Sequence, residues 1–283
     1  MKEGRKIITA KTAGFCFGVK RAVDMAFDAA VKNGGEVYTL GPIIHNPQVV
    51  DKLKSKGVAP TEDIDNIKIS TIIIRTHGVP EEISSKLSAK GYRVVDATCP
   101  FVKKAQQYVK LLRKEGYQVV IIGDREHPEV RGLMSYAGDD VIVVNKDDVL
   151  PKLKNKVGVV VQTTQPPSVL KKFISDAAEH VKELKVFNTI CSSTALRLKE
   201  TKNMSKNVDA MVVVGGKNSA NTAQLAQLCV SMSIPTHHIE TASEIKDEWF
   251  EHTNKVGVTA GASTPDWIIK EVEKRIRDIG GKG

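Results

Sequence analysis

Three stretches of similar design decide the fold: TAGFCFGVKRAVDMA at residues 12–26, VVDATCPFVKKAQQYV at 94–109 and VFNTICSSTALRLKE at 186–200. In each stretch an apolar, strand-like run precedes a cysteine, and a segment with helical periodicity follows it. We therefore expect Cys16, Cys99 and Cys191 to occupy equivalent strand-to-helix turns, from which three thiols can converge on one point.

The chain between the cysteines repeats a second pattern, in which a short Val/Ile-rich run ends in a polar loop. The two clearest runs of each repeat recur at nearly constant distance from its cysteine. They are GEVYTLGPIIHNPQ (35–48) and ISTIIIRTHGVPEE (69–82), YQVVIIGDREHPEV (117–130) and VGVVVQTTQPPS (157–168), and DAMVVVGGKNSAN (209–221) and VGVTAGASTPDW (256–267). Short continuous apolar runs are typical of strands that are covered on both faces, as in parallel sheets.

This repetition predicts an α/β protein built from three pseudo-equivalent small α/β domains with mainly parallel sheets. Each domain has four strands and roughly 90 residues, a permissible domain size. The predicted limits are 1–97, 98–189 and 190–283. In such sheets ligands bind at the carboxyl ends of the strands, so these ends are expected to face one central cavity.

Polar residues at the predicted strand ends are the candidates for a functional site. The loops of the first repeat contain His45 and His77, those of the second contain His127, Glu129 and Thr163, and those of the third contain Ser219, Asn221 and Ser263. Serine and asparagine before a helix also serve as ordinary N-caps, and a histidine at a strand end is often only a loop residue. Both interpretations stay open at this point.

Composition excludes several classes of protein. No apolar run approaches the length of a membrane span, and the N-terminus lacks a convincing leader, so we expect a soluble cytoplasmic protein without membrane contact. The net charge of +9 invites a nucleic-acid partner, but the basic residues are spread over helices and no nucleic-acid motif is present. A basic surface equally suits an anionic substrate and an acidic electron-transfer partner. No Walker lysine motif and no GxGxxG run supports a nucleotide.

The cysteines allow two kinds of metal site. Three thiolates cannot complete a four-cysteine iron–sulfur site, but they can leave one metal open for chemistry. Zinc thiolates usually come in closely spaced pairs, and no CxxC occurs here, although spacing alone leaves iron–sulfur and zinc both open. Cys229 has no counterpart in the other repeats and lies in an apolar helical pattern, so we expect it to be a core residue.

Ordered motifs over nearly the whole chain resemble the 4-hydroxy-3-methylbut-2-enyl diphosphate reductases, the last enzymes of the non-mevalonate isoprenoid pathway. The motifs are GFCFGVKRAV, GPIIHNPQVV, RTHGVP, DATCP, EHPEVRG, QTTQ, NTIC, GGKNSAN and TAGASTPDW. The resemblance implies three α/β domains around one 4Fe–4S cluster per chain. It also implies reductive dehydroxylation of an allylic diphosphate to isopentenyl and dimethylallyl diphosphate, with ferredoxin or flavodoxin as the electron donor.

The resemblance and the repeat give each candidate residue a role. Cys16, Cys99 and Cys191 are expected to bind the cluster, with one iron left open. Glu129 is expected to deliver a proton to the leaving hydroxyl, with His127 and Thr163 relaying the proton or orienting the acid and also contacting the substrate. Asp124 is the nearest rival acid, but it lies outside the EHPEV motif. The remaining candidates, His45, His77, Ser219, Asn221 and Ser263, are expected to bind the diphosphate. Some members of the family have serine where this chain has Ala220, so no side-chain contact is assigned there.

Two alternative functions remain. A non-catalytic iron–sulfur carrier or sensor that binds an anion would be expected to have a fourth cluster cysteine and no acid at Glu129. A zinc hydrolase would contain no iron after anaerobic purification.

Overall fold

The computed structural model describes residues 5–33, 37–44, 46–65, 67 and 71–280. The chain divides into two compact units. One consists of residues 1–20, 44–51 and 192–283, and the other of residues 21–43 and 52–191. In the described part of the chain, no helix is both long and apolar enough to cross a bilayer.

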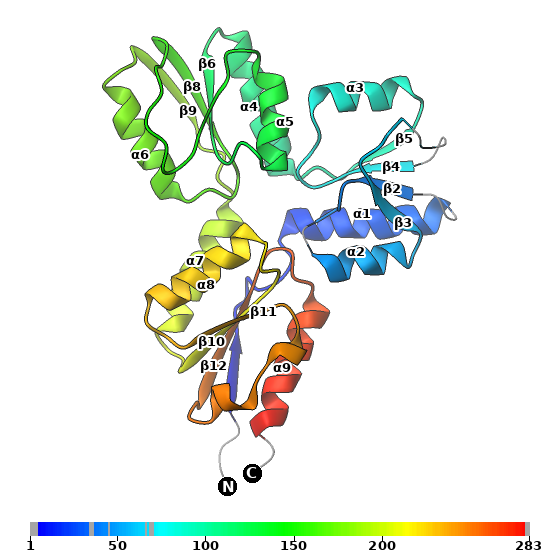
Figure 1. Ribbon diagram of the computed structural model, residues 1–283, viewed down its shortest axis with the longest axis vertical. Helices are drawn as coiled ribbons and strands as arrows, with labels where there is room; N and C mark the ends of the chain where they lie inside the picture. Colours follow the sequence, from blue (N-terminus) through cyan, green and yellow to red (C-terminus); the bar gives the residue numbers. More distant parts are fainter. Residues whose placement is uncertain (1–4, 34–36, 45, 66, 68–70, 281–283) are drawn as a thin grey trace. The chain divides into compact units, whose positions relative to one another are not determined.

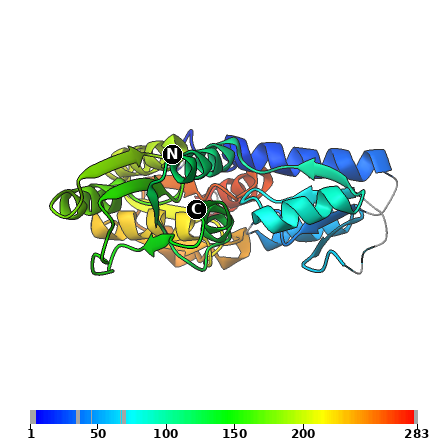
Figure 2. The same ribbon diagram turned by 90° about the horizontal axis from the view of Figure 1, so that it is seen from above.

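The unit of residues 21–43 and 52–191 contains two parallel four-stranded sheets. The first sheet has the order β3-β2-β4-β5, with strands β2 (Val37–Leu40), β3 (Val58–Thr61), β4 (Thr71–Ile74) and β5 (Arg93–Asp96). The helices between Cys16 and Cys99 in the sequence are α1 (Phe17–Asn33), α2 (Pro47–Lys54) and α3 (Glu81–Ala89). Figure 2 shows α1 as one uninterrupted helix. The central strand β4 has the sequence TIII and is buried throughout, as a two-sided parallel strand requires.

The second sheet has the same order of strands, β7-β6-β8-β9. Its strands are β6 (Gln118–Ile122), β7 (Ile142–Val144), β8 (Lys156–Val161) and β9 (Glu183–Phe187), and its helices are α4 (Pro100–Lys114), α5 (Pro128–Ala137) and α6 (Pro167–Ala178). Alternate residues of β6 point to opposite faces, so Val119 and Ile121 pack with α4 and α5, while Val120 and Ile122 pack with α6. Both faces of this sheet are therefore covered (Figure 1).

The third sheet lies in the other unit and has the order β11-β10-β12-β1. Its strands are β10 (Ala210–Val214), β11 (Thr236–Ile239), β12 (Lys255–Ala260) and β1 (Lys6–Thr9). The helices are α7 (Ser192–Ser205), α8 (Ala220–Ser231) and α9 (Asp266–Gly280), with two short 3₁₀ turns at Ala242–Glu244 and Asp247–Phe250. In Figure 1, α7 and α8 cover one face of this sheet and α9 covers the other.

The three sheets share one topology, which confirms the predicted α/β fold with three parallel repeats. The strand β1 departs from the predicted limits, since residues 1–97 were assigned to the first repeat and β1 pairs with β12 of the third sheet. The reason is that each cysteine follows the fourth strand of a sheet, and the third sheet takes this strand from the start of the chain. The limits 98–189 and 190–283 stay predictions.

A glycine directly follows one inner strand of every sheet. Gly41 follows β2, Gly123 follows β6 and Gly215 follows β10. Each glycine N–H donates to the last residue of the neighbouring strand, Thr61, Val144 or Ile239, at 2.7–2.9 Å. A Cβ at each glycine would lie 2.5–2.8 Å from a side chain that follows the third strand, namely Arg75, Gln162 or Thr264. The loops after the two inner strands therefore approach closely. They meet at the switch point of the sheet, the place where the strand order changes direction, and glycine leaves room for this approach.

Candidate functional site

The three repeated cysteines occupy the same structural position. Each is the residue directly before a helix, Cys16 before α1, Cys99 before α4 and Cys191 before α7. Each cysteine N–H donates to the carbonyl of the second residue after the third strand of a sheet. The acceptors are Ala262 at 3.3 Å, Thr76 at 2.9 Å and Thr163 at 2.8 Å, respectively. This hydrogen bond fixes every cysteine at the carboxyl edge of a sheet, beside the strand-end loops.

The environment of these thiols suits a bound group better than a packed core. All three cysteines are half-buried, lie outside any disulfide and stand at helix N-termini, where orphan N–H groups favour negative charge. Cys16 belongs to one compact unit, and Cys99 and Cys191 belong to the other. Within the described residues, no three His, Cys, Asp or Glu side chains form a group that could hold a metal ion.

Cys229 has the contrasting environment. It is fully buried in α8 among the apolar residues between this helix and the third sheet. The hydroxyl of Ser205 donates to its sulfur at 3.7 Å, and burial raises the pKa of the thiol. This is the environment of a core residue, as its isolated position in the sequence predicted.

A buried carboxyl group lies at the switch point of the second sheet. Glu129 is 1% exposed and is the second residue of α5. The Thr163 N–H donates to its Oε1 at 2.7 Å and the Thr163 hydroxyl donates to its Oε2 at 2.8 Å. Burial raises the pKa of Glu129 to about 7, because loss of hydration outweighs the two hydrogen bonds that favour the charged form. The group therefore exchanges a proton near neutral pH.

Two imidazoles accompany this carboxyl group. His127 is the N-cap of α5, and its Nδ1 accepts a hydrogen bond from the Glu129 N–H at 3.2 Å. Because Nδ1 is an acceptor, the proton of a neutral His127 is on Nε2. The ring of His77, from the loop after β4, packs edge-on against the His127 ring with centroids 5.1 Å apart. The structure thus brings together His77, His127, Glu129 and Thr163.

The rival acid Asp124 has a different role in the same loop. It is exposed, and its carboxylate accepts the N–H of Glu126 at 3.0 Å, which closes a local turn. Its own N–H donates to the side chain of Gln162 at 3.0 Å. Asp124 is therefore a turn residue, and Glu129 is the carboxyl group that the loop buries.

The third sheet has hydroxyl and amide groups at its switch point. Ser219 is the N-cap of α8, and its Oγ accepts the N–H of Thr222 at 3.4 Å. Asn221 is the second residue of α8, the position that Glu129 has in α5. Ser263, in the loop after β12, is buried, and its Oγ has no hydrogen-bond partner among the described residues. These groups form a second polar edge, rich in donors and next to a helix N-terminus.

Thr222 was missed in the sequence, although it follows Asn221 directly. It is fully buried, and its hydroxyl also has no hydrogen-bond partner within the described part of the chain. A Cβ at position 261 would clash with this hydroxyl, so only glycine fits there.

Of the predicted site residues, His45 lies outside the described residues. Its neighbour Asn46 is 3% exposed, and its side-chain Oδ1 accepts the N–H of Val49 at 3.0 Å, which caps α2. The equivalent helices α2, α5 and α8 are thus capped by Asn46, His127 and Ser219, respectively.

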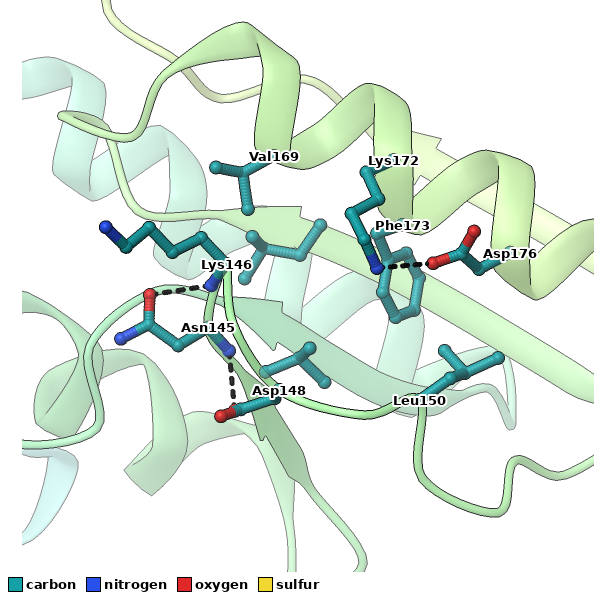
Figure 3. A pocket seen from close by; sticks show the side chains of 10 residues that line it. Asn145, Lys146, Asp148, Leu150, Val169, Lys172, Phe173 and Asp176 are labelled. Carbon is teal, nitrogen blue, oxygen red and sulfur yellow. Dashed lines mark hydrogen bonds and ion pairs between the residues drawn. The ribbon is translucent and has the colours of Figure 1, made fainter.

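A pocket beside α6 contains none of the predicted residues (Figure 3). It lies between α6 and the segment after β7, and its polar groups already satisfy one another. Lys172 forms an ion pair with Asp176 at 2.7 Å, and the Asn145 N–H donates to Asp148 at 2.8 Å. The pocket therefore offers none of the side chains that the sequence predicts for the site.

Comparison with known proteins bears on the site. Residues 7–277 match the family model described as LytB protein. A relative from Pelobacter propionicus, named 4-hydroxy-3-methylbut-2-enyl diphosphate reductase, is 54% identical over 98% of this chain and 99% of its own. A relative of the same name from Aquifex aeolicus is 47% identical, with 96% of each chain covered.

Two solved structures resemble the fold. One is described as (E)-4-hydroxy-3-methyl-but-2-enyl diphosphate reductase, the terminal enzyme of the non-mevalonate pathway. It is 45% identical, with a TM-score of 0.77 over 97% of this chain and 99% of that one. The other is described as the E-1-hydroxy-2-methyl-but-2-enyl-4-diphosphate reductase from Plasmodium falciparum. It is 26% identical, with a TM-score of 0.85 over 96% of this chain and 87% of that one.

Fold and site define a class of three-repeat α/β proteins in which every repeat presents one thiol at the start of a helix. The family match extends over nearly the whole length, and the curated relatives are covered almost completely. The chain belongs to the LytB protein family.

Proposed function

We propose that the chain reduces 4-hydroxy-3-methylbut-2-enyl diphosphate to isopentenyl and dimethylallyl diphosphate. The relatives that are about half identical over nearly the full length have the name of this enzyme. The observation in the site that carries the proposal is Glu129, a buried carboxyl group with a pKa of about 7 at a strand-end edge. An acid that holds a proton at neutral pH is what cleavage of an allylic alcohol requires.

The reaction balances with two electrons and two protons. The carbon–oxygen bond of the allylic alcohol breaks, and the oxygen leaves as water after it takes one proton. The allylic fragment takes two electrons and the second proton, at one of two carbons, which gives the two isomeric products. Hydroxide is a poor leaving group, so the first proton is the one that a positioned acid must supply.

Cys16, Cys99 and Cys191 are proposed to hold one 4Fe–4S cluster per chain. Their equivalent positions before three helices, their half-burial and the soft thiolate donor set fit such a group. When bound through three thiolates, a cluster of this kind supplies one iron without a protein ligand as a Lewis acid, together with a path for electrons. Cys229 takes no part, because it is buried in the core of α8.

Glu129 is proposed to protonate the leaving hydroxyl, with Thr163 and His127 as its partners. Thr163 holds both carboxyl oxygens, and its hydroxyl is placed to pass a proton to or from Oε2. His127 accepts the Glu129 N–H and so fixes the start of α5 on which the acid stands. Both residues are also proposed to contact the substrate, since they share the same edge of the sheet.

The diphosphate is proposed to bind among His45, His77, Ser219, Asn221 and Ser263. The unpartnered hydroxyl of Ser263 supports this role, because a buried donor without a protein acceptor is stabilised by a ligand oxygen. The N-terminus of α8, at Ser219 and Asn221, adds N–H groups that favour an anion. A histidine that is protonated donates a charge-assisted hydrogen bond to phosphate.

Ferredoxin or flavodoxin is proposed as the electron donor, and the cytoplasm as the location. The net charge of +9 complements an acidic donor protein. The four cysteines, all within the described residues, form no disulfide, which is consistent with a reducing compartment.

The proposal is tested by anaerobic purification and reconstitution with iron and sulfide. We expect a brown protein that contains iron and sulfide, and that converts the diphosphate substrate to both products with a chemical reductant. A protein that binds zinc and no iron, or an iron-loaded protein that leaves the diphosphate unchanged, would refute it.

A further inference from the structure

The helix α7, which starts directly after Cys191, turns a row of polar residues toward the protein interior. Its buried positions recur at helical spacing and are, apart from Met204, all polar: Thr194, Arg197, Thr201 and Ser205. A buried polar row on a helix requires specific partners. Arg197 belongs to this row, and Glu200 is a partly buried residue one turn further along the helix. Both have hydrogen-bond partners in the segment that leads to Cys16.

Arg197 ties two backbone segments together. Its side chain is almost completely buried, and its guanidinium donates to the carbonyls of Ala260 at 2.7 Å and Gly14 at 3.0 Å, and to that of Thr12. Ala260 ends the strand β12, and two residues later the carbonyl of Ala262 accepts the N–H of Cys16. The guanidinium therefore holds both the loop that precedes Cys16 and the strand end that fixes its backbone.

Glu200, one turn further along α7, binds the same loop with the opposite polarity. Its carboxylate accepts the N–H groups of Lys11 at 2.8 Å and Thr12 at 2.9 Å, and the Thr12 hydroxyl at 2.6 Å. Burial raises the pKa of Glu200, but the hydrogen bonds from Thr12 and Lys11 outweigh it, so the net pKa is lowered and the side chain stays ionised. Donors and acceptors of the segment 11–14 are thus satisfied by one helix face.

The segment needs such support because it has little of its own. Residues 10–16 contain no helix or strand, and Gly14 has a φ of +88° with side chains of α9 within 3.1 Å of where a Cβ would lie. A second arginine has a related arrangement in the other unit. Arg21 of α1 donates to the carbonyls of Thr98 at 3.3 Å and Asp96 at 3.4 Å, in the segment that leads to Cys99. Arg197, on the helix after Cys191, thus binds the loop before Cys16. Arg21, on the helix after Cys16, binds the segment before Cys99.

We propose that Arg197 and Glu200 are positioning residues that fix the Cys16 loop for its role as a cluster ligand. The inference rests on the proposed function, because it requires Cys16 to bind iron. A ligand on a loose loop dissociates more easily, and residues that orient a metal ligand typically change metal affinity about 10–100-fold when they are replaced. The arginine fork matters here as well as the charge, since its hydrogen bonds diverge to three carbonyls.

The test compares Arg197→Lys and Glu200→Gln with Thr201→Val in the anaerobically reconstituted protein. Thr201 is buried on the same helix and its hydroxyl contacts Thr259, outside the Cys16 loop, so its loss perturbs α7 without touching that loop. The readouts are the rate of iron release to a chelator, the electron paramagnetic resonance spectrum of the reduced cluster, and the unfolding temperature.

We expect both loop variants to release iron about tenfold faster than wild type and to change the spectrum. Thr201→Val should keep the wild-type rate and spectrum even where its unfolding temperature falls. Iron release from Arg197→Lys and Glu200→Gln at the rate of Thr201→Val would overturn the inference. Should Arg197→Lys not fold, Glu200→Gln alone decides. A wild-type protein that binds no iron would instead refute the proposed function, so the two failures are distinguishable.

Discussion

The switch points of the second and third sheets have the same backbone and opposite chemistry. In the second, the helix after the central strand starts His127-Pro128-Glu129, and in the third it starts Ser219-Ala220-Asn221, each with the first residue as N-cap. Glu129 faces the hydroxyl and N–H of Thr163, whereas the residue that matches Thr163 in the third sheet is Ala262, whose side chain forms no hydrogen bond.

We propose that this difference separates a proton site from an anion site. Glu129 is enclosed and saturated by protein donors, so its chemistry is the gain and loss of a proton near pH 7. Ser263 and Thr222 keep buried hydroxyls without partners among the described residues, so this edge has capacity left for ligand oxygens. We propose that one repeated backbone serves two functions, because the side chains at its strand ends differ.

The largest effect is expected from the cysteines. Replacement of Cys16, Cys99 or Cys191 by Ser should abolish bound iron and turnover, because serine is a poor ligand for iron–sulfur clusters. Cys229→Ser should keep both, since this thiol is buried in α8. Iron and sulfide content after reconstitution is the measurement. Full activity of Cys99→Ser would contradict the assignment of the ligands.

Glu129→Gln should lower kcat by about 10²–10⁴-fold, the usual contribution of a positioned acid. Glutamine keeps the size of the side chain and can still pair with the N–H and hydroxyl of Thr163, so iron content and KM should stay near wild type. Anaerobic turnover with a chemical reductant measures both parameters. If KM rises while kcat is unchanged, the second switch point binds the anion and the comparison is reversed.

Asn221→Ala should raise KM roughly 10–100-fold and leave kcat nearly unchanged. Hydrogen bonds to a charged group contribute about 1.5–3 kcal/mol, and Ala keeps the helix intact at this position of α8. Gln224→Ala, a neighbouring amide one turn further along the same helix, is the matched control and should behave as wild type. Equal losses in both variants would point to damage to α8 instead of loss of a substrate contact.

Thr163→Val should have the smallest effect on turnover of these variants, together with a shift in pH dependence. The hydroxyl of Thr163 stabilises the charged form of Glu129, so its removal should raise the pKa of Glu129 above its value of about 7. Protonated Glu129 would then persist to higher pH, and the alkaline loss of turnover should move upward. A shift to lower pH would show that the hydroxyl stabilises the acid form.

Much of this could be predicted from the sequence, because the signals are local. Runs such as VVIIG and MVVVGG, each followed by a polar loop and a helix, predict the strands and the strand ends without knowledge of their partners. The cysteines and Glu129 could be proposed as site residues because they recur in, or interrupt, this local pattern.

The rest depended on contacts between distant residues. The run KIIT at β1 looks like any edge strand, and only its pairing with β12 assigns it to the third sheet. Arg197 looks like a surface residue of a helix, but the carbonyls that bury it come from residues 12, 14 and 260. Burial raises the pKa of Glu129, and the hydrogen bonds that partly offset this rise come from Thr163, which is 34 positions away in the sequence.

The central claim is that Glu129 supplies a proton from the second switch point, and the pH profile of kcat tests it most directly. The pKa of Glu129 is raised, so the acid form dominates below about 7 and the carboxylate above it. In the iron-loaded wild type, kcat should be level below this pH and fall about tenfold per pH unit well above it. In Glu129→Gln the residual kcat should show no such fall. An identical alkaline fall in both proteins, or near-wild-type turnover of the variant with an intact cluster, would contradict the account.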